Sequence, residues 1–295
     1  MLPERYADVK VVLKDHNIIL SARDTFNKSL LNNVVVKMMK RNQIAADEVQ
    51  ILQWLSKRDT RNCIVQLHDY FDFFSYTCVV MEPLGLNLYE MLKDNLFEGL
   101  HRNTVKKMTR QVLGALTFLE EQGIVHGDLK PENVCASLCG KWFKLIDFGH
   151  ASWEHEPNKP TRVQSRYYRS PEVLFCHKYS YPIDMWSLGC MVYELITGSV
   201  LFEGNNDVDM LHRIAGYLGL PPLYMLQQPP RCTLNGAHQA FRQQDDGSFA
   251  PVVTATAWPT LLPHMLAFLQ DILVWAPTDR ARPQMLTTHV FLEYE

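Results

Sequence analysis

The sequence predicts an α+β protein with two lobes, a small and mainly β lobe followed by a larger and mainly α lobe. The chain of 295 residues is long enough for two compact units, since domains average roughly 150 residues. Short β-type runs occur before residue 82, and long helical patterns dominate after it. We therefore expect residues 1–82 to form the small lobe and residues 83–295 to form the larger one.

The charges of the chain are nearly balanced, with a formal net charge of -3. This mixed distribution gives no reason to expect nucleic acid or a membrane surface as a partner. The most apolar run, Met185–Ile196, follows Asp184 and contains Glu194, which is typical of a buried helix and not of a membrane span. The seven cysteines show no CxxC pair. We therefore expect reduced thiols and an intracellular protein, cytoplasmic and/or nuclear.

Three β-type runs open the chain, at residues 9–13, 18–22 and 34–39. In the third run, the two-residue alternation of a strand places Lys37 on the same face as Val35. The helical pattern that follows has an apolar stripe with Glu48 inside it, and the stripe comprises Ile44, Ile51, Leu52 and Leu55. A carboxylate on an apolar face needs a partner, and Lys37 is the natural one. The alternatives are a solvated lysine and a glutamate at the edge of the helix.

The segments HGDLKPENV (126–134) and KLIDFG (144–149) supply two carboxylates, an ammonium group and an amide. Asp128 can accept the proton of a hydroxyl group, and Lys130 is close enough in sequence to meet a transferred phosphate. Asn133 and Asp147 offer the hard oxygen ligands that Mg²⁺ prefers. Taken singly, HGD and DFG are also ordinary turns. The ordered set indicates phosphoryl transfer, with Asp128 and Lys130 as catalytic residues and Asn133 and Asp147 as metal ligands.

Together with an SPE segment in place of APE, these residues resemble the signature of eukaryotic protein kinases, over nearly the whole chain. The resemblance implies the bilobal protein-kinase fold, ATP and Mg²⁺ as cofactors, and proteins as substrates. It also implies that Lys37, paired with Glu48, is held toward the α- and β-phosphates. Two further interactions would belong to the scaffold, namely Glu172 with Arg280, and Asp184 with the backbone of the catalytic loop.

The same resemblance predicts the nucleotide pocket. Val35 would lie above the adenine ring and Cys135 below it. Val35 is larger and Cys135 smaller than the family's usual residues, so the space for adenine would be displaced and not closed. Met81 would be the gatekeeper, the backbone of the linker after it would bind adenine, and Asn87 would meet the ribose. The expected cofactor-binding residues are Ile19, Val35, Lys37, Glu48, Glu82, Leu84, Asn87 and Cys135.

The small lobe departs from the kinase pattern at its phosphate loop. No glycine occurs before Gly85, so the GxGxxG segment is absent, and its three glycine positions would fall at Val12, Lys14 and Asn17. Side chains at these positions hinder a close approach of the backbone to phosphate. They also disfavour positive φ, which asparagine tolerates best.

The sequences QSRYYRSPEVL and YPIDMWSLGC resemble the dual-specificity tyrosine-regulated kinase (DYRK) family and its homeodomain-interacting relatives, in the CMGC group. This resemblance implies serine or threonine followed by proline as the acceptor, with Arg166 shaping the position after it. Glu90 and Glu132 would attract an upstream arginine, or are solvated surface carboxylates. The segment 220–263 resembles the insert of the CMGC group.

Arg162 stands where the DYRK family has its activating tyrosine, and Gly127 replaces the arginine of the HRD motif. An arginine cannot accept phosphate, and we expect Arg162 to be repelled by the basic pair Arg166 and Arg169. Possible phosphorylation sites near Arg162 are Thr161, Ser165, Tyr167 and Tyr168, and the alternative is that they are ordinary loop residues.

Two functions are compatible with these residues. The first is an ATP- and Mg²⁺-dependent serine/threonine kinase of DYRK-like type, expected as a monomer and with dual specificity left open. The second is a pseudokinase scaffold with weak or no phosphotransfer, since the phosphate loop lacks glycine, Arg162 replaces the tyrosine and His150 follows DFG. Losing loop amides costs a rate factor on the order of 10 to 1000. Losing Asp128 or Asp147 would cost far more, and because both are present we favour the enzyme.

Overall fold

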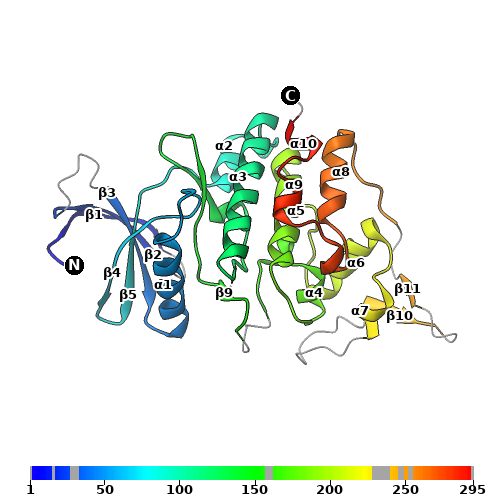
Figure 1. The fold of residues 1–295 in the computed structure, drawn as a ribbon, viewed down its shortest axis with the longest axis horizontal. Helices are drawn as coiled ribbons and strands as arrows, with labels where there is room; N and C mark the ends of the chain where they lie inside the picture. The colour runs from blue at the N-terminus through cyan, green and yellow to red at the C-terminus, as the bar shows by residue number, and fades with distance from the viewer. Residues whose placement is uncertain are drawn as a thin grey trace.

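The computed structural model describes residues 2–14, 17–26, 33–156, 162–227, 240–244, 249–251 and 255–293. A five-stranded sheet and one helix form the N-terminal end of the molecule, and helices dominate the remainder (Figure 1). The predicted α+β architecture with a small β lobe and a larger α lobe is confirmed.

The sheet of the small lobe is antiparallel, in the order β1-β2-β3-β5-β4. Its strands are β1 Tyr6–Lys14, β2 Ile18–Asp24, β3 Asn33–Lys40, β4 Leu67–Phe73 and β5 Tyr76–Met81. The three predicted β-type runs lie within the first three strands. In β3, Val34 and Val36 are buried on one face, and Val35 and Lys37 point to the other, as strand alternation requires.

The segment that replaces the glycine-rich loop lies at the junction of β1 and β2, and residues 15–16 within it are outside the described residues. Strand β1 continues to Lys14 with a register shift between Val11 and Leu13, and β2 begins at Ile18. Val12, Lys14 and Asn17 are not among the residues with positive φ. The chain therefore avoids at these three positions the backbone conformation that only glycine adopts without strain.

Helix α1 (Gln43–Ser56) lies against the sheet and carries Glu48. The Asn42 side chain caps it by accepting a hydrogen bond from the Ala45 amide, 3.0 Å long. Glu48, Ile51, Leu52 and Leu55 are buried as predicted. Ile44 is 59% exposed, so its assignment to the apolar stripe was wrong. It is the second residue of the helix, in the first turn.

The larger lobe contains the remaining helices. They are α2 Leu88–Asp94, α3 Arg102–Glu121, α4 Pro171–Leu174, α5 Pro182–Thr197, α6 Asp207–Leu218, α7 Leu223–Gln227, α8 Pro263–Ile272, α9 Pro283–Leu286 and α10 Val290–Glu293. Helix α5 is buried from Ile183 to Leu195, which agrees with the buried helix predicted there. In the described part of the chain, none of the helices combines the length and the apolar character needed to span a bilayer.

Two short antiparallel strand pairs frame the catalytic segments. Strand β6 (Ile124–Val125) pairs with β9 (Ser152–Trp153), and β7 (Val134–Ala136) pairs with β8 (Phe143–Leu145). A third pair, β10 (Phe241–Gln243) and β11 (Phe249–Pro251), belongs to the predicted insert, of which residues 228–239, 245–248 and 252–254 lie outside the described residues.

The main hydrophobic core is continuous between the lobes, from Leu52 of α1 through α3 to Trp186 of α5. Within the described residues, the free thiols are Cys63, Cys78, Cys135, Cys139 and Cys190. Cys176 is disulfide-bonded, so the expectation of reduced cysteines is wrong at that residue. The expectation used only the local spacing of the cysteines, which does not determine which of them form disulfides.

Candidate active site

The catalytic loop runs from β6 to β7 and is held by a buried carboxylate. The two carboxylate oxygens of Asp184 accept hydrogen bonds from the amides of His126 and Gly127, at 2.7 and 3.0 Å. Gly127 has φ +76°, and a Cβ atom there would lie 2.6 Å from the carbonyl oxygen of His150. The predicted role of Asp184 as a cap of this backbone is confirmed, and the loop conformation requires glycine at its second position.

Asp128, Lys130 and Asn133 converge within this loop. The Lys130 ammonium group donates to Asp128 Oδ2 over 2.8 Å. The Asn133 side-chain amide donates to the Asp128 carbonyl oxygen (2.8 Å) and to Oδ2 (3.2 Å). Asp128 is 4% exposed, so these donors replace the water that its carboxylate would otherwise bind.

Ser165 completes the surroundings of this carboxylate. Its amide and its hydroxyl group donate to Asp128 Oδ1 at 2.9 and 2.8 Å, and the same hydroxyl accepts from Lys130 over 2.9 Å. The preceding residue, Gln164, donates its amide to the Gly127 carbonyl oxygen. Sequence reasoning named Ser165 only as a phosphorylation site, because 35 residues separate it from Lys130. The only sequence signal for the contact of Ser165 with Asp128 was its position in the QSR motif.

The second group of charges joins the two lobes. The Lys37 ammonium group lies 2.7 and 2.9 Å from the carboxylate oxygens of Glu48 and 2.8 Å from Asp147 Oδ1. Burial alone would lower the pKa of Lys37, but the charges of Glu48 and Asp147 outweigh it, and the pKa is raised. Burial opposes ionisation of Asp147 too, yet the charge of Lys37 lowers the pKa of this carboxyl to about 2. Lys37 and Asp147 are therefore charged at neutral pH, whereas burial raises the pKa of Glu48 against the opposing charge of Lys37.

The backbone around Asp147 is compact and strained. Asp147 has φ +60°, a conformation that residues with a side chain rarely adopt and that clusters at functional sites. A Cβ atom on Gly149 would lie 3.3 Å from oxygens of both Asp147 and Glu48. The glycine of DFG therefore allows the segment to pack closely against α1.

The donor set fits a magnesium ion. The Asn133 amide nitrogen faces Asp128, and within the described residues no donor reaches its oxygen. The carboxylate of Asp147 contacts Lys37 through Oδ1. Asn133 and Asp147 are neighbours in space, because the Ile146 amide donates to the Asn133 carbonyl oxygen over 3.0 Å. One side-chain oxygen of Asn133 and one of Asp147 are thus without a donor among the described residues, as ligands of a magnesium ion require.

The residues expected around the nucleotide come from both lobes. Ile19 lies directly opposite Lys37 in the β2–β3 ladder, so the two share one face of the sheet with Val35. Cys135 lies on β7 of the larger lobe. Its backbone forms an isolated antiparallel β-bridge with that of Asn87, just before α2. Leu84 lies in the linker between β5 and α2 and is half-buried.

The side chain of Glu82 is part of a network behind the linker that the sequence did not reveal. Its Oε1 accepts from the Lys144 ammonium group (2.6 Å) and from the Gln66 amide (2.8 Å). Lys144 also donates to Asn62 Oδ1 over 2.6 Å. The Glu82 side chain is thus held away from the backbone edge that would contact adenine.

Asn87 and Glu90 form a capping box at the start of α2. Asn87 Oδ1 accepts from the Glu90 amide (2.8 Å), and the Glu90 carboxylate accepts from the Asn87 amide (2.9 Å). Both side chains therefore have a structural task besides the roles expected of them.

The segment between DFG and SPE, called the activation segment below, carries two arginines whose charges are partly compensated by Asp207. The sequence analysis did not consider this acid. Arg169 donates to Asp207 Oδ1 over 2.8 Å and to the carbonyl oxygens of Val163 and Gln164. Arg162 lies 3.7 Å from the other oxygen of Asp207. Asp207 thus stands between two guanidinium groups, and the expected repulsion between Arg162 and Arg169 is offset.

Two glutamates and a tyrosine gather below this segment. The Tyr168 hydroxyl donates to Glu194 over 2.6 Å, so it is not available for phosphorylation in this conformation. Burial raises the pKa of Glu194 to about 7. Glu132 contributes a buried Oε2 with no hydrogen-bond partner among the described residues. Thr161, another suggested phosphorylation site, lies outside those residues.

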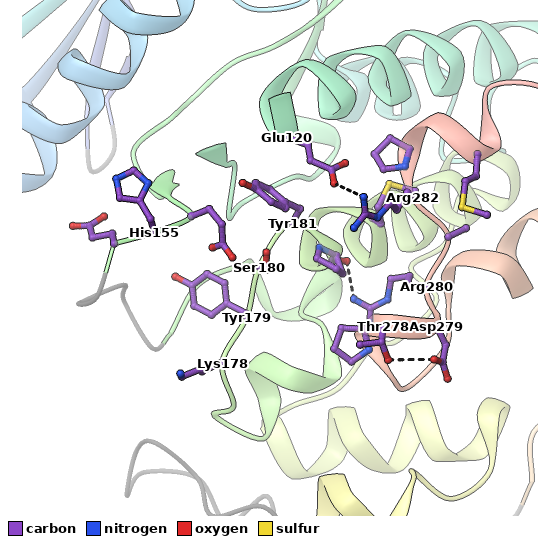
Figure 2. Close-up of a pocket in the computed structure, with 18 residues that line it drawn as sticks. Glu120, His155, Lys178, Tyr179, Ser180, Tyr181, Thr278, Asp279, Arg280 and Arg282 are labelled. Atoms are coloured by element: carbon purple, nitrogen blue, oxygen red, sulfur yellow. Dashed lines mark hydrogen bonds and ion pairs between the residues drawn. The ribbon is translucent and has the colours of Figure 1, made fainter. Parts of the chain in front are cut away.

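A cavity of about 1050 Å³ lies elsewhere on the larger lobe, between the end of α3, the start of α5 and α9 (Figure 2). Glu120 and Arg282 form an ion pair across one of its sides, and Tyr179 and Tyr181 lie along another. None of the predicted site residues lines it. The converging charges described above, and not this cavity, are therefore the candidate active site.

The protein kinase domain model matches residues 21–292. The chain belongs to the protein kinase family. It is 36% identical over 286 residues to human "Dual specificity tyrosine-phosphorylation-regulated kinase 4", which covers 91% of this chain and 54% of the relative. It is 44% identical over 205 residues to the "Dual specificity protein kinase YAK1 homolog" of Arabidopsis thaliana, which covers 66% of this chain and 21% of that protein.

A third relative extends the comparison along nearly the whole chain. The "DYRK-family kinase pom1" of Schizosaccharomyces pombe is 35% identical over 313 residues, which covers 97% of this chain and 28% of that kinase. The predicted resemblance to DYRK kinases is confirmed. The chain spans about half or less of the length of these three relatives.

Proposed function

We propose that this kinase-family chain is an active serine/threonine protein kinase that uses ATP and Mg²⁺. The observation that carries the proposal is the position of Lys37, whose ammonium group contacts Glu48 of the small lobe and Asp147 of the larger one. A scaffold has no need for a buried lysine that contacts acidic side chains of both lobes. Phosphoryl transfer does need a positive charge beside metal ligands.

The side chains have distinct roles in the proposed reaction. Asp128 orients the acceptor hydroxyl group and takes its proton, and Lys130 neutralises charge on the transferred phosphate. Asn133 and Asp147 hold Mg²⁺, and Lys37, positioned by Glu48, binds the α- and β-phosphates. Bound together with Mg²⁺ by these residues, ATP would supply the phosphoryl group.

The proposed nucleotide pocket uses apolar side chains from both lobes and the linker backbone. Ile19 and Val35 would cover the adenine ring from the sheet, and Cys135 would support it from β7. The backbone of Glu82 and Leu84 would bind the adenine edge. Asn87 would meet the ribose through its side-chain nitrogen, since its oxygen caps α2.

We further propose that the acceptor serine or threonine is followed by proline, with Arg166 shaping that position. Glu132 supplies negative charge for an arginine upstream of the acceptor, because its Oε2 has no hydrogen-bond partner among the described residues. Glu90 is the weaker choice because its carboxylate already caps α2. A peptide with an arginine upstream and a proline after the serine is therefore the best first substrate.

A radiolabelled-phosphate assay on such a peptide tests the activity. We expect transfer by the wild type and a loss of at least about 1000-fold with Asp128→Asn, which keeps the size of the side chain and removes its charge. Equal background from both proteins would favour the pseudokinase scaffold, for which the specific argument is that no glycine occurs in the phosphate-loop segment. A thermal-shift titration with ATP and Mg²⁺ then separates failed binding from failed chemistry.

A further inference from the structure

Trp54 of α1 and Trp153 of β9 pack against each other. Their ring centroids are 5.4 Å apart and the ring planes are inclined by 85°. This edge-to-face geometry is a favourable arrangement of two aromatic rings. Trp54 follows Glu48 by six residues, and Trp153 follows Asp147 by six residues. The contact therefore joins the helix that carries Glu48 to the strand that leads away from Asp147.

Each of the two rings is itself held in place. The Arg58 guanidinium group lies 3.4 Å from the centroid of the Trp54 ring and donates to the Trp54 carbonyl oxygen. On the other side, Trp153 pairs with Ile124 in the β6–β9 ladder, and the next amide, that of Glu154, donates to the Gly123 carbonyl oxygen. Strand β6 ends one residue before His126. Trp153 is thus fixed to the base of the catalytic loop.

We propose that the contact between Trp54 and Trp153 positions α1 so that Glu48 reaches Lys37. Both tryptophans are positioning residues, since neither belongs to the site and their effect passes through Glu48. The assignment of Glu48 rests on the proposed function, but the contact between the two elements does not.

A comparison with the neighbouring ion pair supports this role. Arg61, which follows α1, lies 2.8 Å from Glu121 of α3, but both side chains are more than 40% exposed. An exposed ion pair changes an equilibrium by a factor of about 5 at most and is screened by salt. Two indoles in edge-to-face contact contribute a factor of about 2 to 10 beyond the apolar surface that they bury. The aromatic contact is therefore the stronger and less salt-sensitive link between α1 and the larger lobe.

The kinetic test is a double-mutant cycle with Trp54→Ala, Trp153→Ala and the pair. We expect each single variant to raise the KM for ATP about threefold or more, and the double variant to be no worse than the worse single one. Trp54→Phe should restore most of the effect, because an aromatic ring remains. Trp142→Ala is the matched control, since Trp142 is 48% exposed, against 39% for Trp54, and has no ring contact among the described residues.

Multiplicative effects of the two alanine substitutions, or an unchanged KM for ATP, would overturn the proposal. Hydrogen exchange gives a second readout that needs no activity. Trp153→Ala should increase exchange of the α1 amides from Val49 to Leu55, in an element that does not contain the substitution. Unchanged protection of these amides would also overturn it. If the wild type transfers no phosphate but α1 responds in this way, the proposed function fails and the positioning contact stands.

Discussion

The Ser165 hydroxyl group donates a 2.8 Å hydrogen bond to Oδ1 of Asp128, while Lys130 donates to Oδ2 of the same carboxylate. The activation segment therefore orients the proposed catalytic base directly. Ser165→Ala should lower kcat about tenfold, the value of a hydrogen bond to a charged group, with little change in the KM for ATP. Steady-state kinetics with varied ATP and peptide measures this split.

Phosphorylation of Ser165 should inhibit, because it would place a second negative charge beside Asp128. Ser165→Asp should therefore reduce kcat more than Ser165→Ala does, whereas Ser165→Thr should retain most activity. An Asp variant as active as the wild type would show that this hydroxyl group does not contact Asp128 during turnover.

Breaking the buried ion pair of Glu172 and Arg280 should strongly destabilise the larger lobe. Arg280 lies 2.8 Å from Glu172, and both side chains are at most 2% exposed. Arg280→Met leaves a buried carboxylate without its partner, so the free energy of unfolding should fall by about 3–5 kcal/mol. Urea denaturation followed by circular dichroism measures the change.

Arg282→Met is the control for this substitution, two residues away. Arg282 is 75% exposed and lies 3.6 Å from Glu120, so its removal should cost less than about 1 kcal/mol. Equal losses from the two variants would contradict the prediction.

Asp207 should hold the activation segment in place of a phosphate. Asp207→Asn leaves Arg169 without its carboxylate and beside Arg162, so we expect a stability loss of about 1–3 kcal/mol and a lower kcat. Arg162→Gln removes the more exposed guanidinium group and should change stability by no more than about 0.5 kcal/mol. Differential scanning fluorimetry and peptide kinetics on the same samples distinguish the two effects.

The stability should depend on pH through Glu194. Burial raises the pKa of this carboxyl from 4.5 to about 7, so the folded state binds the proton more tightly than the unfolded one. Its contribution therefore favours folding fully below pH 4.5 and declines as the pH rises through 7. Glu194→Gln should make the fall in melting temperature between pH 5 and 7.5 smaller than in the wild type. Glu98→Gln, at an exposed loop residue, should leave the slope unchanged.

The charged pairs of this protein could be predicted from the sequence where a charged residue lies within an apolar pattern. Such a residue needs a partner of opposite charge or a hydrogen-bond donor elsewhere in the chain. Glu48 inside an apolar stripe demanded a cation, and Asp184 amid apolar residues demanded backbone donors. Ile44 was wrongly assigned to the buried stripe because a period of 3.6 residues predicts which face of a helix is apolar. It does not predict how far along the helix that face is covered by neighbouring elements. The contact between Lys144 and Glu82 was missed because 62 residues separate two side chains that are both ordinary on a surface.

The same reasoning explains the outcome in the activation segment. The basic residues Arg162 and Arg169 are close in sequence, so repulsion between them was foreseen. Asp207 lies 38 residues after Arg169 and reaches it only because α6 begins there. Ser165 likewise reaches Asp128 only through the folded path of the segment. Sequence spacing therefore predicts contacts between residues that are close along the chain. Contacts between residues far apart along the chain depend on the tertiary structure.

The tight fit at Gly127 limits how this protein can be brought under external control. Any side chain at Gly127 would collide with the His150 carbonyl oxygen. The arginine of the HRD motif therefore cannot be introduced at Gly127 by a single substitution. An engineered switch that depends on such a group would require the neighbouring loop to be redesigned as well. A designer who wants regulated output would do better to work at the junction of α1 and β9, where surface is accessible and side chains can be exchanged.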